Sequence, residues 1–191
     1  MTDQQIINGL KSGDESAFRT FVDSYQEMVI NVSHRFVHNK EDALDIAQEV
    51  FIKVYNSINA FKAHSKLSTW LYRITVNQSL NYVRDKKRKH IFSSLDLLFE
   101  NHHQDTHYFD QADRDTSQER LEKEENKQIL LKAIEQLPKK QKIAFTLNKL
   151  EDLPYKEVAE IMGITVTETG VLINRARKKL QQKLGVYFKK Y

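Results

Sequence analysis

Residues 155–183 have the pattern of a helix-turn-helix whose second helix is basic. Because the side chain of Ala159 is small, a second helix can cross close behind the first. Gly163, four residues later, can supply the positive φ that ends a helix sharply. Thr165 and Glu168 have the spacing of a capping box, which predicts the start of the next helix. A helix in this position can enter the major groove of DNA, with its early residues at base edges and its basic end at phosphates.

The two faces of that second helix differ in character. Residues that recur at helical spacing are expected to face inward, namely Thr169, Leu172, Ile173, Ala176 and Leu180. Polar and basic residues fall largely on the other side, namely Asn174, Arg175, Lys178 and Lys179. The outer face suits DNA contacts, although an ordinary helical hairpin with a solvated basic end is the alternative.

Composition favours a helical protein. Among 191 residues, 5 glycines and 2 prolines are few for a turn-rich β architecture. The 30 basic and 26 acidic residues leave a net charge of only +4, too small to identify a nucleic-acid binder by itself. The absence of cysteine excludes disulfides and thiolate zinc sites. Because no apolar run approaches the roughly 18 residues of a membrane span and the chain starts with polar residues, we expect a cytoplasmic protein without membrane insertion.

Within the N-terminal part, residues 1–90, the apolar spacing from Asp14 to about Lys89 predicts several amphipathic helices. The clearest spans residues 41–61 and has Asn39 as its expected cap. Its inward stripe comprises Ala43, Ala47, Val50, Val54, Ile58 and Phe61, widened by Ile46, Phe51 and Tyr55. The next helix is expected from near Ser68, and it ends in residues 84–89, where five of six residues are basic.

Residues 91–125 differ in charge and pattern from both ends of the chain. Residues 96–125 contain ten acidic and three basic residues, a charge of about −7. Helical periodicity is poor over most of this segment, so we expect a flexible acidic linker. His102, His103 and His107 lie there near acidic side chains and could hold a metal ion. A titratable tether without metal is the favoured interpretation, and no cofactor is implied.

The helical pattern resumes in residues 126–191, where Pro138 ends one helix and opens the next. Residues 138–191 contain twelve Lys and Arg against five Asp and Glu, about +7. A basic C-terminal domain on an acidic tether is the charge asymmetry expected of a DNA-binding module. The sequence therefore predicts an all-α protein of two small helical domains, the C-terminal one a helix-turn-helix.

One exposed helix face in the N-terminal domain combines carboxylates with an amide. Asp45, Gln48 and Glu49 stand at i, i+3 and i+4, so they share that face. Such a stripe suits docking on a basic helical partner, although most stripes of this kind are solvated helix faces.

Two further groups could contact nucleic acid. The first combines aromatic rings with a short polar stretch and consists of Phe61, Lys62, His64, Ser65, Lys66, Trp70, Tyr72 and Asn77. Rings beside lysines can stack on unpaired bases and hold the phosphates of a strand, but Phe61 and Trp70 suit the core equally well. The second is basic and consists of Arg84, Lys86, Lys87 and Arg88. It could follow a duplex backbone without reading sequence or form a solvated tail.

Motifs in both domains resemble one known family. Residues 41–55 (EDALDIAQEVFIKVY), Phe61 and residues 67–77 (LSTWLYRITVN) resemble the second conserved region of bacterial sigma-70 family factors. The resemblance is closest to the small extracytoplasmic-function (ECF) group. Residues 137–145 (LPKKQKIAF), 153–164 (LPYKEVAEIMGI) and 174–180 (NRARKKL) resemble the fourth region of that group. The motifs occur in the family's order over nearly the whole chain apart from the linker.

The resemblance implies a role for each part. Residues 1–90 would bind core RNA polymerase through Asp45, Gln48 and Glu49, and would capture the non-template strand of the −10 element. Residues 126–191 would read the −35 element, and the linker at residues 91–125 would set the spacing of the two. Promoter DNA, core polymerase and an anti-sigma factor are the partners implied. The chain itself is not expected to be an enzyme, because RNA synthesis belongs to the polymerase.

The recognition helix departs from the family pattern at two positions. Gly170 and Leu172 stand where the group commonly has basic side chains. Because glycine costs about 1 kcal/mol in a helix interior, a close approach of the backbone to DNA or a partner would be one reason for it. Base readout is then expected from Thr165, Thr167, Glu168, Val171, Asn174 and Arg175, with Lys178 and Lys179 at phosphates.

Two other functions are compatible with a C-terminal DNA reader. A duplex-binding repressor or activator would need a dimerisation surface, and the sequence has no heptad seam or second reader. An interaction adaptor with a vestigial DNA module would fit Gly170, but not the basic stretch at residues 175–179. An enzyme is the least compatible, since no Gly-rich phosphate loop or nucleophile triad stands out.

Overall fold

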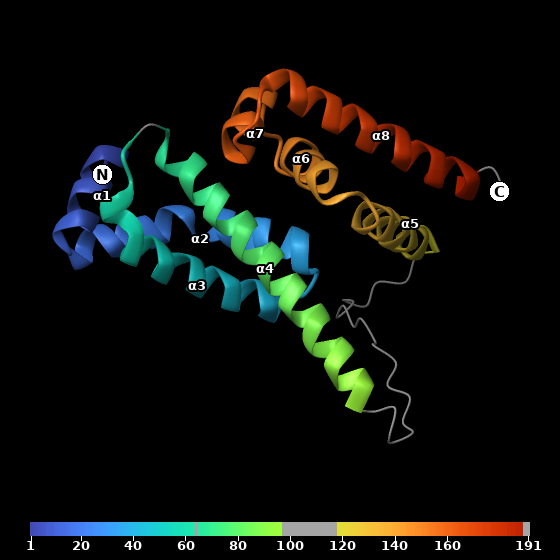
Figure 1. The fold of residues 1–191 in the computed structure, drawn as a ribbon, viewed down its shortest axis with the longest axis horizontal. Coiled ribbons are helices and arrows are strands. Elements are labelled where there is room, and N and C mark those ends of the chain that lie inside the picture. The colour runs from blue at the N-terminus through green and yellow to red at the C-terminus, as the bar shows by residue number, and fades with distance from the viewer. Residues whose placement is uncertain (64, 97–117, 189–191) are drawn as a thin grey trace.

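The structure, a computed structural model, describes residues 1–63, 65–96 and 118–188, and these residues form helices joined by short connections (Figure 1). In chain order the elements are α1 (Asp3–Ser12), α2 (Glu15–Val37), α3 (Lys40–Ser57), the short 3-10 helix η1 (Ile58–Ala60), α4 (Leu67–Asp96), α5 (Gln118–Glu135), α6 (Lys139–Lys149), α7 (Tyr155–Met162) and α8 (Val166–Phe188). The first four α-helices form an N-terminal half and the last four a C-terminal half. The prediction of an all-α protein with two helical parts is confirmed.

The N-terminal half is built around α2, which packs against α1, α3 and α4. Its core collects apolar side chains from each helix, and the largest that are fully buried are Phe21, Ile46, Ile58, Leu67 and Leu71. The inward stripe predicted for α3 is buried at Ala43, Ala47, Val50 and Val54. Helix α4 starts at Leu67, one residue before the expected Ser68. The first turns of α4 pack against this core.

Helix α1 precedes the segment in which helices were expected. Thr2 and Gln5 form a capping box, in which each side chain accepts a hydrogen bond from the other's backbone N–H. Ile6, Ile7 and Leu10 are then buried against the N-terminal core. The helix crosses α2 closely at Gly9, where a β-carbon would lie 2.3 Å from the Cβ of Ala17.

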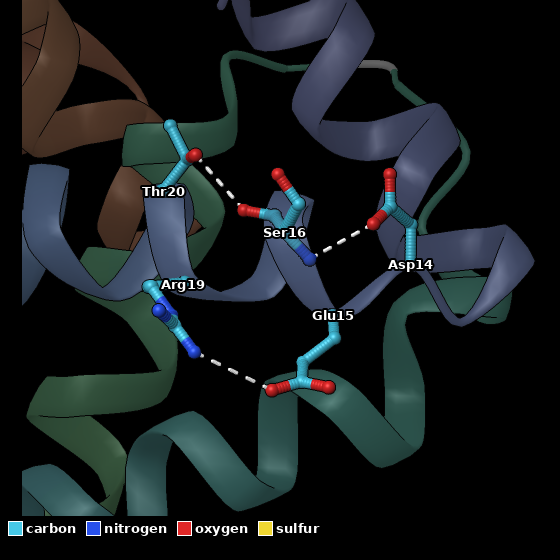
Figure 2. A network of polar contacts seen from close by, with 5 residues as sticks. All are labelled: Asp14, Glu15, Ser16, Arg19 and Thr20. Atoms are coloured by element: carbon cyan, nitrogen blue, oxygen red, sulfur yellow. Dashed lines mark hydrogen bonds and ion pairs between the residues drawn. The ribbon is translucent and has the colours of Figure 1, made fainter.

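The start of α2 is stabilised by local polar contacts (Figure 2). Asp14 accepts a hydrogen bond from the backbone N–H of Ser16 at 2.8 Å, which satisfies one of the free donors of the first turn. The Thr20 hydroxyl donates to the Ser16 carbonyl at 2.9 Å. Arg19 and Glu15 form an ion pair of 3.5 Å that is largely exposed and therefore contributes little to stability.

The C-terminal half is held together by α8, which packs against α5, α6 and α7. A small core of Ala133, Ile134, Leu137, Ala176 and Leu180 joins α5, and the turn after it, to α8. The chain turns from α5 into α6 through Pro138, which is the N-cap residue of α6. The predicted role of Pro138 between two helices is confirmed.

The two halves share a third apolar cluster, which we call the interdomain interface. From the N-terminal half it contains Val32, Phe36 and Val76, with Met28, Tyr72 and Leu80 partly buried against it. From the C-terminal half it contains Ile143, Ala144, Leu147, Val158, Ile161 and Ile173. Helix α4 packs directly on α7, and both lie side by side in Figure 1. The sequence pattern did not predict this contact.

The helix boundaries differ from expectation in two places. The helix predicted over residues 41–61 ends at Ser57 and is followed by η1, after which the chain leaves helical geometry at Phe61. Helix α4 extends to Asp96 and α5 begins at Gln118, so helices occupy both ends of the linker predicted at residues 91–125. Residues 97–117, including the linker histidines, lie outside the described residues.

Candidate functional site

The helix-turn-helix forms as the sequence predicts. Gly163 has φ 65° and ends α7, and its backbone N–H donates to the last turn of that helix. Thr165 caps α8, because its side-chain oxygen accepts the backbone N–H of Glu168 at 3.1 Å. Ala159 is buried where α7 approaches α8. These local features fix the angle at which α8 leaves α7.

The first turns of α8 present polar and small apolar groups to solvent. The inward residues Thr169, Ile173, Ala176 and Leu180 are buried, as predicted. The exposed residues include Thr165, Thr167, Glu168, Val171, Asn174, Arg175, Lys178 and Lys179. Val166 is also exposed and was not among the candidates, although its position next to Thr165 could have indicated it. This face can offer hydrogen bonds to base edges, methyl contacts to thymine and ammonium groups to phosphates.

Gly170 and Leu172 occupy different environments on α8. A β-carbon at Gly170 would lie 3.5 Å from a ring carbon of Tyr155, which is ordinary van der Waals contact. A close approach within the described chain therefore does not explain the glycine. Leu172 is half-buried against the interdomain interface rather than directed at solvent.

The aromatic residues before and within α4 serve mainly as packing. Phe61 is 5% exposed and belongs to the N-terminal core, with its ring centroid 4.9 Å from that of Trp70. Of the two interpretations left open for Phe61, the structure supports the core, because the side chain is buried in this arrangement. Trp70 is half-buried and packs on the same core.

The polar residues of this region are more accessible. Lys62, Lys66 and Asn77 are exposed, and Ser65 is half-buried, while His64 lies outside the described residues. Lys66 forms an ion pair of 2.9 Å with Glu157 of α7. Tyr72 is half-buried beside the interdomain interface, where burial together with the charges of Glu151 and Glu157 raises its pKa to about 12.

The basic run continues α4 beyond the N-terminal core. Arg84, Lys86, Lys87 and Arg88 are all exposed on this helix. Lys86 forms an ion pair of 2.6 Å with Asp42 of α3, and the hydroxyl of Tyr82 donates to the same carboxylate at 2.7 Å. The remaining side chains extend a positive stripe along the helix, which suits contacts with a phosphate backbone.

The acidic stripe on α3 is exposed at Asp45, Gln48 and Glu49. An apolar residue that sequence reasoning passed over completes the stripe, because Ile52 is 60% exposed and follows Gln48 by one helical turn. Tyr55 corrects another expectation, since it is 47% exposed rather than inward, although its ring contacts Phe18 edge to face at 5.4 Å. The stripe therefore combines carboxylates with an exposed apolar group at its C-terminal end, which suits protein docking.

Each half of the chain matches a model of a known protein family. The model described as Sigma-70 region 2 matches residues 21–89, and the model described as Sigma-70, region 4 matches residues 127–180. The ECF RNA polymerase sigma-E factor of Haemophilus influenzae is 36% identical over 187 residues, which cover 96% of this chain and 96% of that protein. The chain belongs to the sigma-70 family. It is a sigma factor of the ECF group and acts in promoter-directed transcription initiation.

Other comparisons agree with this assignment. The ECF RNA polymerase sigma-E factor of Escherichia coli K12 is 33% identical over 184 residues, covering 96% of this sigma factor and 95% of that protein. The solved structure of CnrH in complex with the cytosolic domain of CnrY has a TM-score of 0.66 at 19% identity and covers 96% of this chain and 97% of that one. The sigma factor RpoE of Bartonella quintana, solved with the anti-sigma factor NepR, has a TM-score of 0.62 at 20% identity, with coverages of 88% and 97%. These structures share the fold.

The described part of this sigma factor contains neither a membrane-spanning helix nor a cluster of metal ligands. None of the helices there is long and apolar enough to cross a membrane. Within residues 1–63, 65–96 and 118–188, no group of three or more His, Asp or Glu side chains could hold a metal ion.

Proposed function

We propose that this sigma factor assigns three steps of initiation to three separate surfaces. Helix α3 docks on core RNA polymerase, the chain from Lys62 through the start of α4 holds the open non-template strand of the −10 element, and α8 reads the −35 element. One observation supports the proposal most directly, namely that the two faces of α8 differ in burial. The buried face anchors the helix, and the exposed face of its first turns is free to enter the major groove. Residues 1–90 and 126–191 are the corresponding working domains.

The docking surface comprises Asp45, Gln48, Glu49 and Ile52. The carboxylates steer a basic partner toward the helix, and Ile52 supplies apolar area that loses water on contact. Glu49 also accepts a hydrogen bond from Gln78 of α4 at 3.4 Å, so the stripe is held relative to the next helix. An exposed isoleucine beside carboxylates fits protein binding better than it fits simple solvation.

The −10 surface comprises Lys62, Ser65, Lys66, Tyr72 and Asn77, with Trp70 as its support. Lysine ammonium groups bind phosphates, while the hydroxyl and amide groups can hydrogen-bond to unpaired bases. Arg84, Lys86, Lys87 and Arg88 then follow the upstream duplex without sequence preference. Because the strand must leave the base stack before it is held, this surface acts after docking.

The −35 surface comprises the exposed residues of the first turns of α8 and the basic residues that follow. Asn174 and Arg175 can form bidentate hydrogen bonds with adenine and guanine edges, and Val166 and Val171 can contact thymine methyl groups. Lys178 and Lys179 lie further along the same face and suit phosphates. A protein partner of the anti-sigma type is also part of the proposal, since a solved relative of the same fold is a complex of a sigma factor with an anti-sigma factor.

The test is transcription with purified core polymerase. The chain and the polymerase are incubated with fragments of the genome that encodes the chain, and the 5′ ends of the RNA are sequenced. We expect new start sites that share two sequence elements at a fixed spacing. Start sites identical to those of core polymerase alone would overturn the proposal.

A further inference from the structure

The C-terminal half has an apolar groove that none of the three proposed surfaces uses. It runs along α5 and α8 in two adjoining parts, and Leu184 of α8 lines both of them. Leu130 and Phe145 line one part, and Ile129 lines the other. Leu130 is exposed, and the other three residues are half-buried. We call this surface the α5–α8 groove. Apolar side chains gathered in contact with water indicate a binding site.

The edge of the α5–α8 groove is basic. Arg177 lines one part, and Lys132 and Lys183 line the other. All three residues are exposed, and none of the described residues that line the groove is acidic. The groove therefore suits a partner that brings apolar groups together with carboxylates.

One exposed face of α3 has this complementary chemistry. Leu44 is 39% exposed and Ile52 is 60% exposed, and Gln48 lies one helical turn from each. The spacing i, i+4 and i+8 places these three residues in one row along the helix. Asp45 and Glu49 form an acidic row beside it. A helix with exposed apolar residues in a row is the kind of element that binds in a groove.

Within one molecule the α3 face and the α5–α8 groove do not meet. Helix α3 packs on α2, α4 and η1. Figure 1 shows α3 and α8 along opposite edges of the molecule. The two complementary surfaces can therefore come together only between two copies of the chain.

We propose that this sigma factor self-associates head to tail, with α3 of one copy bound in the α5–α8 groove of the next. Leu44 and Ile52 lose water against Leu130 and Leu184 of the neighbouring copy, and the carboxylates of α3 face the basic edge of the groove. Because the two surfaces differ, each added copy leaves one of each free. The copies therefore form an open chain rather than a closed dimer.

Self-association competes with polymerase docking, a consequence that rests on the proposed function of α3. The Asp45, Glu49 and Ile52 side chains that bind the groove are the ones assigned to core polymerase. Sigma factor in excess of polymerase is then withheld in oligomers, and free polymerase releases it by mass action. The helical period places Leu184 and Asn174 on different faces of α8, so the contact does not use the base readers.

The test is the mass of the full chain in solution, measured by sedimentation velocity over a range of concentrations. We expect the weight-average mass to reach roughly twice that of one chain in the submillimolar range, and to fall when salt is added. The stripe variant is Asp45→Lys with Glu49→Lys, and the groove variant is Lys132→Glu with Lys183→Glu. Each variant alone should sediment as a single chain, because like charges then face each other at the contact.

An equimolar mixture of the two variants is the decisive sample. The basic α3 of the stripe variant can bind the acidic groove of the groove variant, and the unchanged α3 of the groove variant can bind the unchanged groove of the stripe variant. We therefore expect association to return in the mixture, with the same helix content by circular dichroism in every sample. A mixture that stays monomeric although both variants are folded would overturn the proposal.

Two control variants carry the same charge changes elsewhere. Asp23→Lys with Glu27→Lys matches the stripe variant, and Arg19→Glu with Lys149→Glu matches the groove variant. All four positions are exposed, and both controls should associate like the parent chain. Loss of association in the controls as well would show that net charge decides it, and the proposed contact would be wrong.

Other occupants of the groove give a different result. If the parent chain is monomeric at every concentration and the groove variant no longer binds core polymerase, the polymerase occupies the groove and the proposal is overturned. Failure of the proposed docking function is distinguishable, because the parent chain would then self-associate while the stripe variant still co-purified with core polymerase.

Discussion

The ring of Tyr155 lies over Gly170, 3.5 Å from the point where a β-carbon of that residue would stand. This contact places the first residue of α7 against the early turns of α8, where the −35 surface begins. The space is sufficient for a methyl group, so the glycine is not required by packing within the described chain. Its cost to the helix is therefore open to direct measurement.

Gly170→Ala should raise the free energy of unfolding by about 1 kcal/mol, because alanine is the better helix former and its methyl group meets Tyr155 at an ordinary distance. Thermal or urea unfolding followed by circular dichroism measures this. Gly163→Ala is the matched comparison. It should lower stability by about 1 kcal/mol, because Gly163 has φ 65° and an L residue is strained there. Equal effects of the two changes would contradict this explanation.

Charge reversal on α3 should weaken polymerase binding. Asp45→Lys with Glu49→Lys removes the carboxylates of the docking stripe, and both side chains are exposed, so helix content should stay normal. Ile52→Ala should weaken binding as well, by about 1 kcal/mol, because less apolar area is then buried on contact. Co-purification with core polymerase is the measurement. Asp23→Lys with Glu27→Lys, the same charge change on exposed positions of α2, should leave binding intact.

Substitutions of base-contacting residues and of phosphate-contacting residues on α8 should affect the sequence preference of DNA binding differently. Asn174→Ala or Arg175→Ala should cost about 1–3 kcal/mol on the preferred −35 sequence and less on others. Lys178→Ala or Lys179→Ala should weaken binding on all sequences and reduce the salt dependence. Transcription from −35 variants at several salt concentrations separates these cases. If the lysine changes alter sequence preference and the Asn174 change does not, the assignment of this helix face is wrong.

The −10 surface should matter most when the duplex has to be opened. Replacing Lys62, Ser65 and Lys66 together with Ala should reduce initiation on a fully paired promoter. The defect should shrink on a template whose −10 bases are mismatched, because unpaired bases cost less to unstack. Permanganate footprinting near −10 measures the opening. Trp70→Ala should instead destabilise the N-terminal half and impair both templates, because its ring packs on Phe61.

Acid should weaken the contact around Glu135, which is bound by His38 of the N-terminal half and by Lys142 of α6. Burial raises the pKa of Glu135, but these donors and their positive charge outweigh it and lower the pKa from 4.5 to about 2. A carboxyl whose pKa is lowered by folding contributes stability above its unfolded pKa, and that contribution is lost as the pH falls from about 4.5 toward 2.

Glu135→Gln should therefore lower the free energy of unfolding near neutral pH and flatten its decline in that acid range. Urea unfolding at a series of pH values tests this. Glu15→Gln is the control for the loss of one carboxylate, because Glu15 is exposed at the start of α2. A Glu135→Gln profile parallel to that of the parent chain would show that the carboxyl is not responsible.

The sequence by itself determined the local features of the helix-turn-helix and of α3. Gly163 ends α7, Thr165 caps α8 and Asn39 caps α3, each in the predicted role. The inward positions Thr169, Ile173 and Leu180 follow from the helical period alone. These features depend on residues within a few positions of one another, so a single sequence contains the information.

Only the tertiary structure decided which apolar faces meet and which charged groups lie at their edges. The helical period predicts both Tyr55 and Phe61 on the inward stripe of α3, yet Tyr55, still within α3, is exposed, whereas Phe61 is buried where the backbone becomes extended after η1. Arg73 carries no local signal, and its partners at Glu160 and Ile161 lie far along the chain. An apolar stripe indicates that a face is buried but not what covers it, since the hydrophobic effect has no direction. The contact of α4 with α7, and with it the ion pair between Lys66 and Glu157, therefore depends on how whole helices pack.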